Sequence, residues 1–126
     1  MEDANKIISK STANVVMPLK ILKNGYLYNP NIRVSLYKKD TMSAYNQNYS
    51  IVDLGTHVTN ELTLVGNNVY YVTETPINFN GTLESYNLLD LNLITNNFDN
   101  TGYKLAFELF AGNKKRGTIE KYFIVK

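Results

Sequence analysis

The sequence contains no cysteine among its 126 residues. Disulfides, Cys-ligated zinc sites, iron–sulfur clusters and thiol nucleophiles are therefore all excluded. Histidine is nearly as scarce, because His57 is the only one, and its neighbours from Gly55 to Thr59 show no nucleophile-elbow pattern. Neither a carboxylate pair nor a cofactor-binding loop is visible, so we expect a protein that is not an enzyme and holds no cofactor.

A long apolar run and a strong net charge are also missing. No stretch approaches the ~18–20 apolar residues that span a bilayer, and the segment from Met1 to Lys6 lacks the basic and apolar regions of a secretory signal. The formal charge is only +2, and the densest basic cluster, Lys114–Arg116, lies between Gly112 and Gly117, where we expect a solvated hairpin tip. We predict neither membrane insertion nor nucleic-acid binding, and any export signal would lie outside this sequence.

The acidic residues are too widely spaced for a calcium loop. Asp40, Asp53, Asp90 and Asp99 lie far apart, and none of them begins an alternating Asp/Asn series. The loop Asn96–Asn100 offers several side-chain oxygens, but turn formation explains the same residues. We therefore predict no metal site.

The chain does contain many short β-prone runs. Hydrophobic residues make up 44% and charged residues 19%, which is typical of a folded domain. Runs rich in Val, Ile, Leu, Tyr, Phe and Thr alternate with segments of Asn, Asp, Gly or Pro. The runs lie at 18–23, 31–38, 49–55, 61–65, 69–73, 89–94, 103–110 and 118–125. Two of them, 49–55 and 61–65, have no clear register, so we expect about seven strands.

Several runs alternate apolar and polar residues strictly. Such alternation predicts a strand with one face in the core and one face in solvent. The side chains expected to point outward are Arg33, Ser35 and Tyr37 in the run 31–38, and Lys104, Ala106, Glu108 and Phe110 in the run 103–110. The cluster Gly66–Asn68 between two runs predicts a hairpin turn.

Strand number and spacing favour an immunoglobulin-like antiparallel β-sandwich, with a jelly roll as the alternative. We expect a single domain over residues 18–126, preceded by a flexible or linker-like segment over residues 1–17. The isolated domain is expected to be monomeric.

The segment Asp99–Leu105 resembles the corner before strand F of immunoglobulin-like domains. In that corner an acidic residue stands four positions before a Tyr, and a core residue stands two positions after it, as Asp99, Tyr103 and Leu105 do here. The resemblance implies that the Tyr103 hydroxyl bonds to backbone upstream. Gly102 falls one position later than the small residue of the family pattern, and there is no Trp for strand C.

The closing part of the chain, Gly102–Phe110 and Gly117–Lys126, also resembles the last hairpin of immunoglobulin-like modules in Gram-positive surface proteins. Eighteen Asn and ten Tyr, with few Arg, indicate AT-rich codons and a low-GC bacterium. The resemblance implies an extracellular or cell-surface location. It also implies a non-catalytic structural or interaction module, acting as a spacer or an adhesive domain.

A carbohydrate-binding module is the alternative function. Exposed tyrosine offers a flat apolar ring with a polar tip, which suits both sugars and proteins. Five tyrosines fall in or beside the expected loops and are the candidate ligand-binding residues. They are Tyr26, Tyr28, Tyr45, Tyr49 and Tyr86. A sugar binder should hold several tyrosine rings coplanar, whereas a spacer should scatter them and keep its two ends far apart.

Overall fold

The structure, a computed structural model, describes residues 6–11, 14–22, 30–40, 48–72, 85–111 and 113–126. Within these ranges the chain forms nine β-strands and two 3-10 helices. The strands are β1 (Lys6–Ile8), β2 (Asn14–Leu22), β3 (Pro30–Lys39), β4 (Tyr49–Val52), β5 (Leu62–Gly66), β6 (Val69–Val72), β7 (Ser85–Ile94), β8 (Gly102–Ala111) and β9 (Lys114–Val125). The helices are η1 (Leu54–Thr56) and η2 (Thr95–Asn97).

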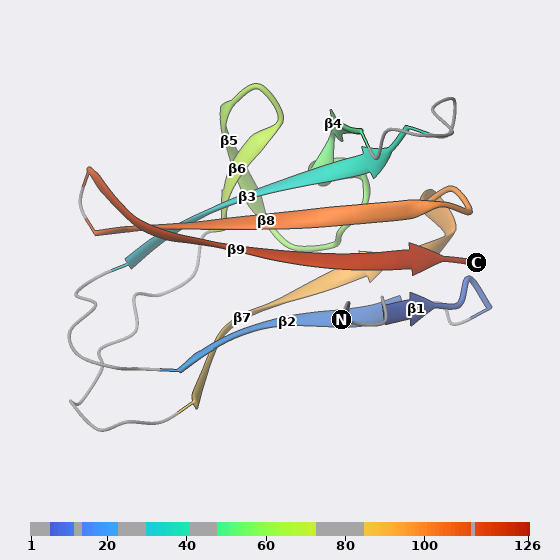
Figure 1. Cartoon of the computed structure of the whole chain (residues 1–126), viewed down its shortest axis with the longest axis horizontal. Helices are drawn as coiled ribbons and strands as arrows, with labels where there is room; N and C mark the ends of the chain where they lie inside the picture. Colours follow the sequence, from blue (N-terminus) through green and yellow to red (C-terminus); the bar gives the residue numbers. More distant parts are fainter. Residues whose placement is uncertain (1–5, 12–13, 23–29, 41–47, 73–84, 112) are drawn as a thin grey trace.

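The strands form two sheets that pack as a β-sandwich (Figure 1). The larger sheet has the order β1-β9-β8-β3-β6-β5, with β4 also paired to β3, and the smaller sheet is β2-β7. In immunoglobulin-type sandwiches, strands C, F and G share one sheet and strands B and E share the other. Here β3, β8 and β9 are neighbours in one sheet while β2 pairs with β7, and the predicted all-β sandwich is confirmed.

One strand pair departs from the antiparallel prediction. Strand β1 runs parallel to β9, with Lys6 opposite Phe123 and Ile8 opposite Val125. All the other strand pairs of the described chain are antiparallel. The beginning of the described chain therefore lies beside the end of β9.

The N-terminal part of the chain also differs from the sequence prediction. We expected residues 1–17 to be a linker, but Lys6–Ile8 forms β1 and the first half of β2 precedes Pro18. Ile8 and Met17 are only 2% and 3% exposed, because both side chains belong to the core. A three-residue strand is too short to show a period of two, and Pro18 suggested a strand start although β2 continues through it, as an edge strand can.

Alternation explains which faces of the long strands are buried. In β3, Ile32, Val34 and Leu36 are at most 7% exposed, as predicted. Ser35 is also buried, at 4%, although it points away from the core. It lies opposite Ala106 on an interior strand of the larger sheet, so its neighbours on both sides cover it.

Of the two predicted hairpin turns, one is confirmed and the other is wrong. The Gly66–Asn68 cluster joins β5 to β6 as expected, and Asn68 adopts a φ of 60°, a left-handed conformation that Asn tolerates. Lys114–Arg116 is not a hairpin tip, because β9 already begins at Lys114, which pairs with Ala111. The basic cluster therefore lies on a strand, and Lys115 faces its neighbours across the sheet.

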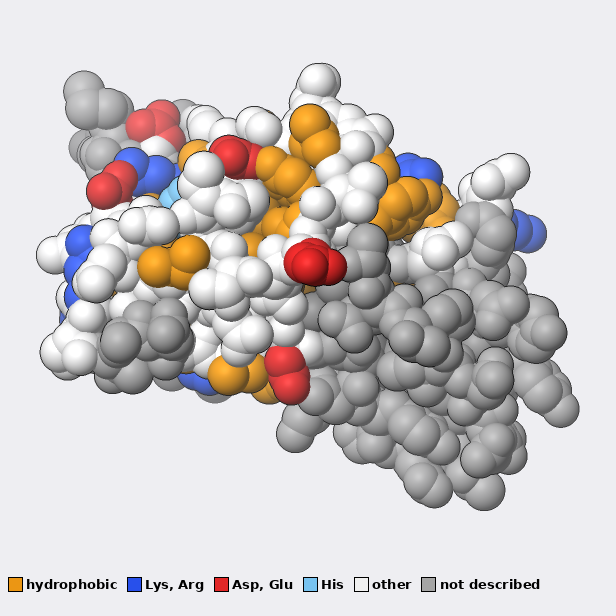
Figure 2. All heavy atoms as spheres, turned by 180° about the vertical axis from the view of Figure 1, so that it is seen from behind, with side chains coloured by type: hydrophobic (Ala, Val, Ile, Leu, Met, Phe, Trp, Pro, Cys, Tyr) orange, Lys and Arg blue, Asp and Glu red, His pale blue; other side chains and the backbone are white. Residues whose placement is uncertain are grey.

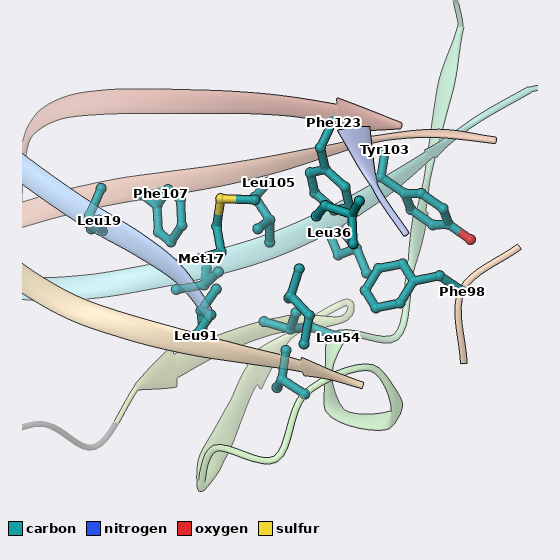
Figure 3. Packing of buried hydrophobic residues seen from close by; sticks show 14 of the residues in the cluster. Met17, Leu19, Leu36, Leu54, Leu91, Phe98, Tyr103, Leu105, Phe107 and Phe123 are labelled. Carbon is teal, nitrogen blue, oxygen red and sulfur yellow. The ribbon is translucent and has the colours of Figure 1, made fainter. Parts of the chain in front are cut away.

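The core lies between the two sheets (Figure 3). Met17, Leu19 and Leu91 reach it from the smaller sheet and meet Leu105 and Phe107 from the larger one. At one end of the core three aromatic rings pack together. Phe98 lies 4.9 Å from Tyr103 and 5.9 Å from Phe123, measured between ring centroids, and the last two rings stack 5.7 Å apart.

The segment after η1 hydrogen-bonds to β7 and so links the larger sheet to the smaller one. The Thr59 N–H donates to the Asn92 carbonyl at 3.0 Å, and the Asn60 side chain continues the pairing. The Asn60 Oδ1 atom accepts from the Asn92 N–H at 2.8 Å, while its Nδ2 donates to the Asp90 carbonyl at 2.9 Å. One side-chain amide therefore satisfies two backbone groups of β7 that a neighbouring strand would otherwise satisfy.

Candidate binding face

The five predicted tyrosines have different outcomes. Tyr26, Tyr28 and Tyr45 lie outside the described residues. Tyr86 belongs to β7, where it pairs with Ile21, and its side chain also falls outside the description. Only Tyr49, the first residue of β4, can be placed with its side chain, and it contacts Tyr122, which was not a predicted binding residue.

Tyr49 contacts Lys104 and Tyr122 on the side of the larger sheet that faces away from β2 and β7. We call this side the outer face, and Figure 1 shows the two sheets that define it. Its polar and aromatic members come from five strands. They are Arg33, Ser35, Tyr37, Tyr49, Tyr71, Lys104, Ala106, Glu108, Phe110, Lys115, Glu120 and Tyr122. The predicted outward orientation of the β3 and β8 side chains is confirmed. Figure 2, which views the molecule from behind Figure 1, shows hydrophobic side chains reaching the surface among polar and charged ones.

The first cluster on the outer face is built around Lys104. The strand register places Lys104 between Tyr37 on β3 and Tyr122 on β9. The ammonium nitrogen lies 4.6 Å from the ring centroid of Tyr37 and 5.5 Å from that of Tyr49, and 3.5 Å from a carboxylate oxygen of Glu120. The ammonium thus has cation–π contacts and an ion pair, and its side chain is only 19% exposed.

Tyr122 is the most accessible ring described in this cluster, with 41% of its surface exposed. It meets Tyr49 edge to face, with ring centroids 5.8 Å apart and an interplanar angle of 70°. Partial burial raises the pKa of its hydroxyl, and donation to Glu120 at 3.1 Å raises it further. The hydroxyl therefore stays neutral at physiological pH and can take part in hydrogen bonds to a ligand.

The second cluster is built around Arg33. Its guanidinium carbon lies 4.3 Å from the ring centroid of Phe110 and 5.3 Å from that of Tyr71. One terminal nitrogen donates to the Tyr71 hydroxyl at 3.2 Å. Glu108 lies directly opposite Arg33 in the sheet, yet its carboxylate pairs with Lys115 at 2.9 Å.

Small neutral side chains separate the two clusters. Ser35 and Ala106 lie opposite each other, one row between the Tyr37–Lys104 pair and the Arg33–Glu108 pair. Both residues are almost fully covered, at 4% and 8% exposed. On β3 and β8 the two groups of rings and charges are thus separated by small neutral side chains, while Glu120 of β9 lies opposite Ala106 in the same row.

The predicted corner lies elsewhere, at the start of β8, and its contacts are structural. The Asp99 N–H donates to the Tyr103 hydroxyl oxygen at 2.8 Å, which is the type of bond that the resemblance implied. Leu105 is fully buried. The Asp99 carboxylate pairs with Lys38, and this hydrogen bond, before any other cause, lowers the pKa of Asp99.

His57 has a hydroxyl and an acid nearby, so its geometry bears on catalysis. Its Nδ1 lies 2.7 Å from the Asp53 carbonyl oxygen, which can only accept, so Nδ1 carries a proton and donates. The Thr56 hydroxyl also donates to this carbonyl, at 3.1 Å, and the Asp53 carboxylate accepts from Tyr70. These groups hold η1 in place, while the imidazole packs 4.7 Å from Phe98. Nothing in this arrangement leaves the Thr56 hydroxyl activated as a nucleophile.

The described part of the chain also bears on two other predictions, which concern a metal site and a membrane-spanning segment. There, no three His, Asp or Glu side chains lie close enough together to hold a metal ion. Asn97, one of the oxygen-bearing residues of the Asn96–Asn100 loop, donates from its amide to the Thr56 carbonyl at 2.7 Å. No helix in the described ranges has the length and apolar character needed to cross a bilayer.

Comparison with known protein families, with curated proteins and with solved structures found no match to this chain. The function must therefore be argued from the residues of the outer face themselves.

Proposed function

We propose that this domain is a non-catalytic, adhesive interaction module of a bacterial cell-surface or secreted protein, and that it contacts a protein partner through the outer face. The observation that carries the proposal is the gathering of Arg33, Lys104 and four tyrosines on one side of one sheet. Tyrosine and arginine are the side chains most enriched among the energetically dominant residues of protein interfaces. The cellular setting rests on the resemblance of Gly102–Phe110 and Gly117–Lys126 to the closing hairpin of surface-protein modules, and on the composition of the chain.

Ring geometry favours a protein over a sugar as the partner. A sugar-binding platform needs rings that lie parallel to one plane, but Tyr49 and Tyr122 are inclined at 70°. Edge-to-face rings with an ammonium beneath them form an uneven surface that suits side chains of a protein. The carbohydrate-binding alternative relied mainly on loop tyrosines, three of which lie outside the described residues.

The position of the chain ends favours an adhesive role over a spacer role. A spacer transmits its length best when the chain enters at one end of the sandwich and leaves at the other. Here Lys6 lies opposite Phe123, and the Lys10 N–H donates to the Lys126 carbonyl at 2.9 Å. The two described ends of the chain thus lie side by side, which leaves the opposite end and the sheet faces available for contacts.

The proposal is tested by screening the purified domain on an array of extracellular-matrix proteins and glycans. Tyr122→Ala removes an exposed ring from the outer face, and Val16→Ala trims a 48% exposed residue on β2 in the other sheet. We expect a protein on the array to bind the wild type and the Val16→Ala variant, and to bind Tyr122→Ala at least tenfold more weakly. Equal binding by both variants would place the contact elsewhere, and a folded domain that binds nothing would leave the spacer role.

A further inference from the structure

Two cations of the outer face, Arg33 and Lys39, take part in none of the ion pairs formed by the described residues. Lys104 pairs with Glu120, and Lys115 pairs with Glu108. Among the ion pairs of the described residues, none includes Arg33. The acid that lies directly across the sheet from it, Glu108, is already engaged with Lys115.

The hydrogen-bonding capacity of Arg33 is also largely unused. A guanidinium has five N–H donors, and in the described structure one bond is formed, to the Tyr71 hydroxyl. The Nε atom is buried and has no acceptor. A buried donor without a partner is costly, so the guanidinium is not fully compensated within the described structure.

The two flanking rings hold the guanidinium in a defined plane. Phe110 and Tyr71 contact it from β8 and β6, while β3 carries its backbone. A planar, preorganised guanidinium loses little conformational entropy when it binds, and its fork of donors matches the two oxygens of a carboxylate. The Nε atom is buried, so a carboxylate from outside must approach the terminal nitrogens of this fork.

We infer that Arg33, Tyr71 and Phe110 form the anchor for a single carboxylate side chain, Asp or Glu, of an otherwise uncharged segment of the partner protein. This inference rests on the proposed function and names the chemistry that the outer face recognises. Beside Arg33, Glu108 and Lys115 pair with each other, so the flanking residues of such a segment need not carry charge.

The test uses two libraries of acetylated, amidated heptapeptides in which the central residue is Glu or Gln and the other positions are randomised among uncharged residues. We expect the wild-type domain to retain the Glu library about tenfold more strongly than the Gln library at pH 7. Arg33→Gln should abolish this preference. Arg33→Lys should also lose most of it, because an ammonium keeps the charge but not the fork. Lys6→Gln, which removes one positive charge from β1, should leave the preference intact.

Three outcomes would overturn the inference. One is equal retention of the two libraries by the wild type, and another is a Glu preference that survives in Arg33→Gln. The third is binding of glucuronic acid or heparin without any Glu preference, which would assign Arg33 to a glycan. If both libraries bind equally and Tyr122→Ala releases both, the outer face remains the interaction surface and only the carboxylate anchor fails. If neither library binds, both proposals fail.

Discussion

The backbone N–H of Asp99 donates a 2.8 Å hydrogen bond to the hydroxyl oxygen of Tyr103. Tyr103 is 1% exposed and its ring lies among Phe98 and Phe123 at one end of the core. The bond therefore joins the turn after η2 to the core at the point where β8 begins. It also gives a buried hydroxyl an assigned partner, as a buried polar group requires.

Tyr103→Phe should lower the free energy of unfolding by about 1–2 kcal/mol, because the Asp99 N–H loses its acceptor while the ring remains. Urea unfolding followed by circular dichroism measures the change. The matched control is Tyr122→Phe, which removes an exposed hydroxyl bonded to Glu120 and should cost less than about 0.5 kcal/mol. Similar losses in the two variants would show that the corner bond is not stabilising.

The ion pair between Lys38 and Asp99 should make stability depend on pH in the acid range. The Lys38 hydrogen bond lowers the pKa of Asp99 below its ordinary value of 3.8. A carboxyl whose pKa is lower in the folded state stabilises the fold above the unfolded pKa, and this contribution disappears as pH falls through the folded pKa. The urea midpoints of wild type and Asp99→Asn should therefore converge as the pH falls below about 4.

Salt distinguishes the ion pair from the corner bond. The two side chains are 35% and 69% exposed, so 1 M NaCl should screen their attraction and reduce the difference between wild type and Asp99→Asn at pH 7. The corner bond uses the backbone N–H, which Asp99→Asn retains. A difference that is unchanged by both salt and acid would mean that the ion pair contributes nothing to stability.

Asn60→Asp should destabilise the domain at pH 7 by about 1–3 kcal/mol, because an ionised carboxylate cannot donate to the Asp90 carbonyl. Thermal or urea unfolding measures this loss. Asn96→Asp introduces the same change at an exposed residue of η2 and should have a small effect. The proposed role of Asn60 would be wrong if both variants unfolded at the same urea concentration.

Leu105→Ala should cost about 2–5 kcal/mol of unfolding free energy, since the side chain is fully buried and its removal leaves a cavity. That is a large share of the ~5–15 kcal/mol total stability of a domain. Leu105→Met keeps most of the volume and should cost less than about 1.5 kcal/mol. Denaturant titration of the two variants compares them. A loss below about 1 kcal/mol for Leu105→Ala would contradict the placement of this residue in the core.

The sequence was sufficient to predict the fold class because alternation and turn residues are local signals. The run 103–110 predicted the buried and exposed faces of β8, and Gly66–Asn68 predicted a hairpin. Strand β1 could not be predicted, since three residues carry no period and its stability comes from pairing with β9, more than a hundred residues away in sequence. Lys114 was misassigned because Gly112 and Gly117 indicate a turn without fixing where it ends.

The sequence predicted only part of the candidate site, because it predicts which way side chains point but not which strands are adjacent. Alternation correctly predicted that Arg33, Tyr37 and Lys104 point outward, but it does not predict which strands are neighbours in the sheet. The adjacency of β3, β8 and β9 brings Tyr37, Lys104 and Tyr122 into one row, and that order is a property of the tertiary fold. The sequence led us to predict tyrosines in or beside loops as binding residues, whereas the described cluster is formed mainly by tyrosines on strands.

Amide chemical-shift mapping of the labelled domain with the tightest-binding protein from the array tests the proposed interaction surface most directly. We predict that the largest shifts fall in β3, β8 and β9 around Lys104 and Arg33, and that β2 and β7 change little. Shifts concentrated in β2 and β7, or the absence of any binding partner for a folded domain, would contradict the assignment of the outer face as the interaction surface.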